Sequence, residues 1–192
     1  MEQDSQFRNN EKLESQIREA YGRIVYTFTC HNKMTQRLLK KNSSIKICQI
    51  VLSALATGGF LTTLLYDKII ASYVGTIISL ILLVLNMYTK DFDLVGKATE
   101  HQKTADQLWK IREEYISLLV DFEVLERAKV ISKRDDLQKR TMEIYNQSPR
   151  TDSKSYKEAQ KALKKDEEQT FSEKEIDNIL PNSIRRLNKK QH

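Results

Sequence analysis

The chain has 192 residues, a formal net charge of +6, and 32 Lys and Arg residues against 26 Asp and Glu. Its five Gly and two Pro are few for a turn-rich β architecture, so the composition favours long uninterrupted helices. The two Cys have no C-x-x-C spacing, which argues against a disulfide framework and fits a reducing cytosol. The first 40 residues hold no apolar core, so no secretory signal peptide is expected.

Residues 1–41 are predicted to form a cytosolic amphipathic helix, because apolar residues recur there at intervals of three and four. Four residues of its apolar line are expected to pack against a second helix: Ile24, Phe28, His31 and Leu38. Cys30 points elsewhere, toward the polar side of the helix.

The adjacent Cys30 and His31 raise the question of a nucleophile–base pair or half of a metal site. Neighbours on a helix diverge by about 100°, so the two side chains cannot readily reach one metal or each other. We therefore expect no catalytic residue and no metal ligand here, and a buried His31 hydrogen-bonded to a facing helix. The other interpretation is a proton-sensitive contact, because the ordinary His pKa of about 6.5 lies near physiological pH.

A transmembrane hairpin is predicted for residues 42–90, with spans at about 45–66 and 69–89. Lys46 is the only charge in the first span, and the second span has none. The first span would be about 33 Å long as a helix, which matches a hydrocarbon core of about 30 Å.

Asp67 and Lys68 separate the two apolar stretches. One long buried helix is the rival interpretation, but at mid-membrane each charge would cost about 2.5–3.5 kcal/mol. At a hairpin tip the same charges reach headgroups and water. Just before the first span, residues 42–44 (Asn-Ser-Ser) are N-cap types, so the N-terminal helix should end or kink there.

Basic residues flank the outer ends of both spans, whereas the connecting turn holds Lys68 alone. Both termini are therefore predicted to be cytoplasmic. The membrane face also accounts for the net charge, and direct nucleic-acid binding is not expected. The flanking residues are Lys33, Arg37, Lys40, Lys41 and Lys46 before the spans, and Lys90, Lys97 and Lys103 after them.

A second cytosolic helix is predicted for residues 91–146, packed on the N-terminal helix as a coiled stalk. The residues of its stripe expected in this packing are Leu108, Trp109, Tyr115, Leu119 and Phe122.

Residues 147–192 are predicted to be a polar tail with short helices. The first is a marginal helix with a thin apolar stripe: Tyr156, Ala159 and Leu163. A capping box at Ser172 and Glu175 then predicts a short helix that ends near Pro181. The basic segment 184–190 is either a solvated terminus or a clamp on the stalk, on anionic lipid or on a partner.

Polar residues follow one face of each predicted span: Gln49, Ser53 and Thr63 in the first, and Ser72, Thr76, Ser79 and Asn86 in the second. Unpaired polar groups that face lipid are costly, so these faces should contact another helix or water. Ordinary helix packing and pore lining both stay open. A single hairpin encloses no channel, so a pore requires an oligomer, and Gln49 and Asn86 are the strongest lining candidates.

No phosphate-binding loop, dinucleotide-binding, zinc-protease or nucleophile-elbow motif occurs in the sequence. The adjacent acidic pairs Glu113–Glu114 and Asp135–Asp136 diverge on their helices and indicate solvated faces. We expect neither enzyme activity nor a cofactor.

The order of elements resembles the SLATT family, the SMODS and SLOG-associating two-transmembrane effectors of bacterial conflict systems. The resemblance rests on the two spans with their minimal turn and on three segments: YGRIVYTFTCHNKM, ISLLVDFEVLERAKVISKRDDL and EIDNILPNSIRR. It implies an all-α protein of the bacterial inner membrane that oligomerises, forms a pore, and kills or arrests the host cell when phage infection is sensed.

The resemblance also implies partners. These are the lipid bilayer, further copies of the chain, and a separately encoded sensor from a nucleotide-signal system or, in one branch, a reverse transcriptase. The alternative function is a non-conducting membrane anchor that recruits a soluble complex.

Overall fold

The computed structural model describes residues 2–66, 69–181 and 184–185, with side chains from residue 8 onward except those of residues 63–66. The described residues form an all-α structure without strands. The helices are α1 (Glu2–Tyr66), α2 (Ile69–Asp91), α3 (Leu94–Val120), α4 (Arg127–Gln147), α5 (Ser153–Lys164) and α6 (Glu173–Ile179).

α1 runs without interruption over 65 residues, so the end or kink predicted at residues 42–44 is wrong. Ser44 shows the reason. Its Oγ donates a hydrogen bond to the Lys40 carbonyl oxygen at 3.0 Å, one turn back, which satisfies a cap-type side chain while the helix continues. The stalk and the first span therefore share one rod, about 98 Å long at ~1.5 Å per residue.

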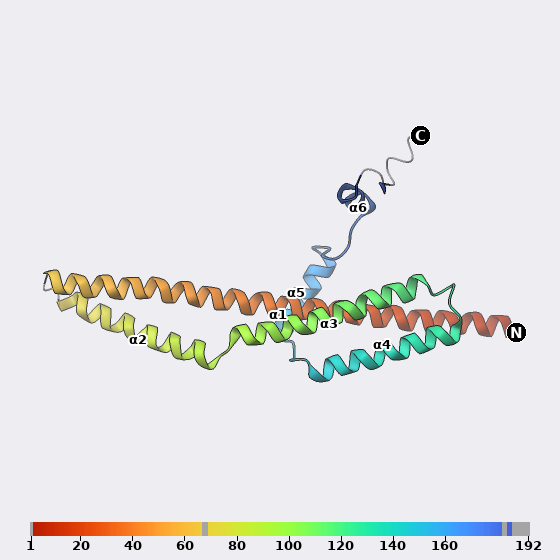
Figure 1. Cartoon of the computed structure of the whole chain (residues 1–192), viewed down its shortest axis with the longest axis horizontal. Coiled ribbons are helices and arrows are strands. Elements are labelled where there is room, and N and C mark those ends of the chain that lie inside the picture. The colour runs from red at the N-terminus through yellow and green to blue at the C-terminus, as the bar shows by residue number, and fades with distance from the viewer. Residues whose placement is uncertain (1, 67–68, 182–183, 186–192) are drawn as a thin grey trace.

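α2 returns along the C-terminal part of α1 and completes the predicted hairpin (Figure 1). Two glycines allow a close approach: a Cβ added at Gly59 would lie 3.5 Å from the Ala71 carbonyl oxygen, and one added at Gly75 would lie 4.0 Å from that of Ala56. Two helical stretches are long and apolar enough to cross a membrane, and none of their most apolar window is buried within the protein. That exposure argues against the buried-core interpretation.

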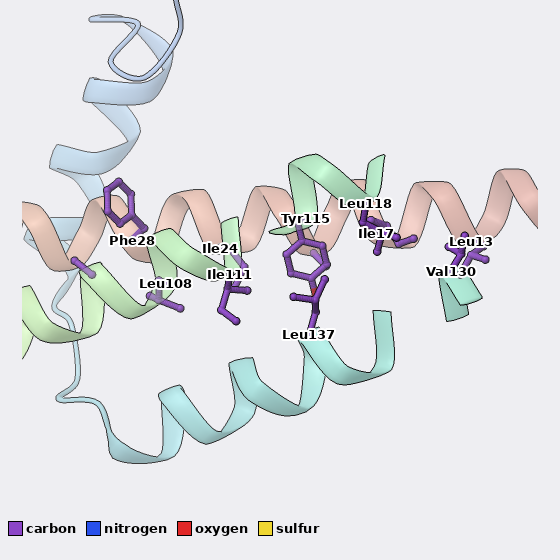
Figure 2. Packing of buried hydrophobic residues seen from close by; sticks show 12 residues of the cluster. Leu13, Ile17, Ile24, Phe28, Leu108, Ile111, Tyr115, Leu118, Val130 and Leu137 are labelled. Carbon is purple, nitrogen blue, oxygen red and sulfur yellow. The ribbon is translucent and has the colours of Figure 1, made fainter. Parts of the chain in front are cut away.

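The stalk is formed by the N-terminal part of α1, by α3 and by α4 (Figure 1). α3 begins after a short break at which the Asp93 side chain accepts a hydrogen bond from the Gly96 backbone N–H at 2.7 Å. The core of the stalk is a cluster of buried hydrophobic residues (Figure 2). Burying an Ile, Leu or Phe side chain contributes about 1.5–3 kcal/mol. Members of the cluster include Leu13, Ile17, Ile24 and Phe28 of α1, Leu108, Ile111, Tyr115 and Leu118 of α3, and Val130 and Leu137 of α4.

The predicted single helix over residues 91–146 is also wrong, because α3 stops at Val120 and α4 folds back beside it. Two backbone N–H groups in the connecting turn, those of Val124 and Leu125, donate to the Asp121 carbonyl oxygen. The reversal brings Val130 and Leu137 into the cluster, with 2% and 3% of each residue exposed. A straight helix would have carried both side chains away from α1.

α5 packs on another side of α1, and α6 follows at the end of the described chain (Figure 1). The predicted capping box is present: the Ser172 side chain accepts from the Glu175 backbone N–H, and the Glu175 carboxylate accepts from that of Ser172. α6 ends at Ile179, near the predicted stop at Pro181. Within the predicted basic segment 184–190, residues 186–190 lie outside the described part.

Candidate functional site

The two halves of the hairpin pack through small and aliphatic residues. Those partly buried in the interface are Ile45, Leu52, Ala56 and Gly59 on α1, and Ala71, Gly75, Ile78, Leu82 and Leu85 on α2. Gly and Ala allow the two backbones to come close. Close packing of this kind holds helices together in a membrane, because lipid is as apolar as the side chains and the hydrophobic effect does not drive helix association there.

Gln49 and Asn86 meet at the edge of this interface. The Gln49 Nε2 atom donates a hydrogen bond to Asn86 Oδ1 at 2.8 Å. Each amide therefore has a partner inside its own hairpin, which lowers the cost of holding it at membrane depth. The two strongest lining candidates are thus brought together as an interhelix pair.

Four other predicted polar residues stay exposed on the hairpin: Ser53, Ser72, Thr76 and Ser79. Around the helix axes, Ser53, Ser72 and Ser79 are rotated from the packed face by roughly 80–100°, and Thr76 is rotated by roughly 140° in the same sense. The two helices are antiparallel, so rotations in the same sense place all four residues on one side of the hairpin, which we call the polar side. The Thr63 side chain and the tip residues Asp67 and Lys68 lie outside the described residues.

Two of the hydroxyl groups on the polar side bond to their own helix. Thr76 Oγ1 donates to the Ser72 carbonyl oxygen at 2.9 Å, and Ser79 Oγ donates to that of Gly75 at 2.9 Å. Each oxygen keeps lone pairs that can accept a hydrogen bond from water or a second helix. Leu83 shares this side and is 56% exposed, so the polar side is mixed rather than continuous.

In the stalk, His31 of α1 faces His101 of α3, with 2.9 Å between the two Nδ1 atoms. The residues are 2% and 4% exposed. At this distance one Nδ1 must donate and the other must accept, so at least one ring is neutral. One turn further along α1, Thr35 Oγ1 donates to the Ala98 carbonyl oxygen at 3.3 Å and adds a second buried contact between the helices.

Burial lowers the pKa of His31 to about 4, and His101 beside it contributes to the decrease. Burial also lowers the pKa of His101, and Arg37 acts in the same direction, whereas Glu100 and Asp152 oppose the decrease. The pair is therefore neutral at physiological pH, and protonation of either ring is unfavourable in the folded state.

Cys30 does not lie on an exposed polar face as predicted, because it is only 4% exposed. Burial, followed by the negative charge of Asp152, raises its pKa to about 11. A thiol held protonated in this way is a poor nucleophile and metal ligand. Throughout the ranges described, no group of three or more His, Cys, Asp or Glu side chains is placed to hold a metal ion.

The burial of Cys30 follows from the docking of α5 on α1. The docked face carries Tyr26 and Lys33, each about one helical turn from Cys30, and Arg37, about two turns from it. Tyr26 stacks on Tyr156 with ring centroids 5.9 Å apart, Lys33 pairs with Glu168 at 2.8 Å, and Arg37 pairs with Asp152 and Glu158. The heptad-like spacing of Tyr26, Lys33 and Arg37 was the feature of the sequence that could have indicated this second packed face of α1.

The predicted stalk residues occupy different depths. Ile24, His31, Leu108 and Tyr115 are almost fully buried, and Phe28 is 9% exposed. Leu38, Leu119 and Phe122 are partly buried. Trp109 is 43% exposed, although its ring lies 5.4 Å from that of Phe28 and beneath the Arg112 guanidinium at 4.4 Å.

Comparisons with known proteins bear on these features. No curated protein and no solved structure matches the chain. The sequence profile of one family does match, over residues 13–175, which includes the stalk, both spans and α5. The chain is thus an all-α membrane protein that belongs to the SMODS and SLOG-associating 2TM effector domain family 4.

Proposed function

We propose that this effector oligomerises in the bacterial inner membrane, with both termini in the cytoplasm, and forms a pore whose opening depolarises the cell. Opening of the pore kills or arrests the host cell, which defends the bacterial population against phage. A separately encoded sensor, from a nucleotide-signal system or a reverse transcriptase, supplies the trigger. The chain itself performs no catalytic step in this proposal.

The polar side of the hairpin is the observation that carries the proposal. Ser53, Ser72, Thr76 and Ser79 lie on the same side, away from the face by which α1 packs on α2. Several hairpins arranged around an axis with this side inward would give hydroxyl oxygens and a few aliphatic side chains along a water-filled path. The family description, a two-transmembrane effector, supports a function in the membrane.

The alternative is a non-conducting anchor that recruits a soluble complex. The hydrogen bond between Gln49 and Asn86 favours it, because two prominent polar residues serve the hairpin itself. The bonds from Thr76 and Ser79 to their own backbone favour it too, since such hydroxyls tolerate lipid at lower cost.

The two functions can be distinguished in cells that express the chain with its genomic neighbour. A voltage-sensitive dye reports the membrane potential of these cells. A triple variant, Ser72→Leu with Thr76→Leu and Ser79→Leu, fills the polar side. Val74→Leu with Ile81→Leu and Val84→Leu is its matched control, because these three residues are exposed elsewhere on α2. If the chain forms a pore, triggering should depolarise cells that express the wild type or the control variant, and it should not depolarise cells that express the polar-side variant.

Membrane insertion of each variant is verified by fractionation. An inserted and triggered wild type that leaves the potential unchanged would leave the anchor as the function. Normal depolarisation by the polar-side variant would remove that side from any conducting path.

A further inference from the structure

A groove of about 890 Å³ opens on the side of the stalk, away from the membrane hairpin. Its walls come from three places: α1, the end of α4 with the loop that follows, and the beginning of α5. The volume falls within the ~300–1,000 Å³ of small-molecule sites, which also favour apolar and aromatic walls. None of the residues that form the polar side of the hairpin contributes to this groove.

Gly22 lies in the wall that α1 contributes to the groove. A Gly in a helix interior costs about 1 kcal/mol relative to Ala. Here a Cβ at residue 22 would meet no atom within 4 Å. The Gly therefore serves no close contact inside the chain, and its effect is to leave the groove open.

Aromatic rings form one wall beside Gly22. Tyr26 and Tyr156 are stacked with an interplanar angle of 25°, and Tyr156 remains 53% exposed. Tyr145 joins them from the end of α4 and is 41% exposed, with its hydroxyl held by Thr27 Oγ1 at 3.3 Å. Rings that are stacked and anchored offer a flat aromatic ligand a surface with little loss of side-chain entropy.

Positive charge flanks the same wall. Arg23 lies on α1 and is held by Glu19, whose carboxylate its Nη1 contacts at 2.5 Å. Arg150 lies in the loop after α4, where it is exposed and makes no hydrogen bond or ion pair with any residue that the structure describes. A guanidinium can bind a carboxylate or a phosphate through two parallel hydrogen bonds, so Arg150 is placed to bind an anion.

We propose that this groove binds a small molecule in which a flat aromatic ring carries a phosphate or a carboxylate. The ring stacks on Tyr156, and the anion is held by Arg150 with support from Arg23. His31 lies in the wall that α1 contributes, so the ligand sits beside the buried histidine pair of the stalk. The proposal concerns binding and does not depend on conduction by the hairpin.

Isothermal titration calorimetry on the full chain in lipid nanodiscs tests the proposal. AMP and 4-hydroxyphenylacetate represent the phosphate and carboxylate forms of the ligand. Adenosine and ribose 5-phosphate supply the ring and the anion of AMP separately. We expect saturable binding of AMP, of 4-hydroxyphenylacetate or of both, at one molecule per chain. If AMP binds, we expect each of its two halves to bind at least about tenfold more weakly.

Variants locate the binding in the groove. Gly22→Leu should abolish it with an unchanged or higher melting temperature, because the new side chain fills open space and suits a helix better than Gly. Arg150→Gln and Tyr156→Leu should each weaken it about tenfold, whereas Tyr156→Phe keeps the ring and should bind as the wild type does. Arg8→Gln and Phe171→Leu change exposed residues outside the groove and serve as matched controls.

Absence of binding by both ring-bearing anions up to about 1 mM would overturn the proposal. So would undiminished binding to Gly22→Leu, or an equal affinity of AMP and ribose 5-phosphate, since the ring would then contribute nothing.

Discussion

At the scale of single residues, the paired imidazoles of His31 and His101 are the most distinctive feature of the stalk. The 2.9 Å contact between their Nδ1 atoms joins α1 to α3 about 21 Å, at ~1.5 Å per residue, from the predicted start of the first span. The sequence predicted a buried His31 bonded to a facing helix, from its place on the apolar line of α1. His101 could not be identified as the partner, because pairing register between two helices is not visible in either helix alone.

Acid should weaken the stalk through this pair. The folded protein holds His31 at a pKa of about 4, below the ordinary value of about 6.5, so the unfolded chain binds protons first as the pH falls. The stability that the neutral pair contributes is complete above pH ~6.5 and is lost progressively toward pH ~4. At ~1.4 kcal/mol per pKa unit, the loss is about 3.5 kcal/mol.

Denaturant unfolding of the full chain at pH 7.5, 6, 5 and 4.5 measures this loss. The double variant His31→Leu with His101→Leu is the control, since it removes both titrating rings without leaving a buried group unpaired. We expect the wild type to lose more stability than the variant across this window. Parallel pH profiles for the two proteins would show that the pair does not couple the stalk to protons.

At the scale of elements, the existence and type of most helices followed from apolar spacing, whereas their ends did not. The cap-type residues 42–44 suggested an end to α1, but Ser44 bonds back to Lys40 and the helix continues. The turn after Val120 has neither Gly nor Pro, so no local residue pattern predicted it. It forms because folding α4 back buries Val130 and Leu137, and such a tertiary gain cannot be read from one segment.

The docking of α5 predicts how Cys30 reacts. The thiol is buried and its pKa is raised to about 11, so N-ethylmaleimide should modify it very slowly in a Cys48→Ser background. Ala159 is fully buried on α5, and Ala159→Leu should overpack that contact by about 1–3 kcal/mol and release the helix. We expect Cys30 modification to become at least about tenfold faster, a change that corresponds to ~1.4 kcal/mol.

Mass spectrometry of the alkylated protein over time gives the two rates. Gln160→Leu is the matched control, because residue 160 is exposed on the same helix. Rapid labelling of Cys30 in the Cys48→Ser protein, or equal rates in the Ala159→Leu and Gln160→Leu variants, would contradict the docked position of α5.

At the scale of the whole molecule, one long helix, α1, contributes both to the packed core of the stalk and to the first membrane span. Apolar length and charge distribution were enough to predict the hairpin, because the bilayer imposes that pattern on any sequence. The Gln49–Asn86 pair and the shared polar side required the relative placement of α1 and α2. The sequence showed a polar stripe on each helix, but not that the two stripes lie on the same side of the hairpin.

The central claim is that the polar side of the hairpin faces water when the effector is active. Thr76→Cys in the Cys48→Ser background tests it, with Val84→Cys, exposed elsewhere on α2, as control. Cells that express the chain with its genomic neighbour are triggered, treated with a membrane-impermeant thiol reagent, and scored for labelling and membrane potential. We predict that Thr76→Cys is labelled only after triggering and that labelling blocks depolarisation, while Val84→Cys stays unlabelled. Depolarised cells in which Thr76→Cys remains unlabelled would contradict the claim.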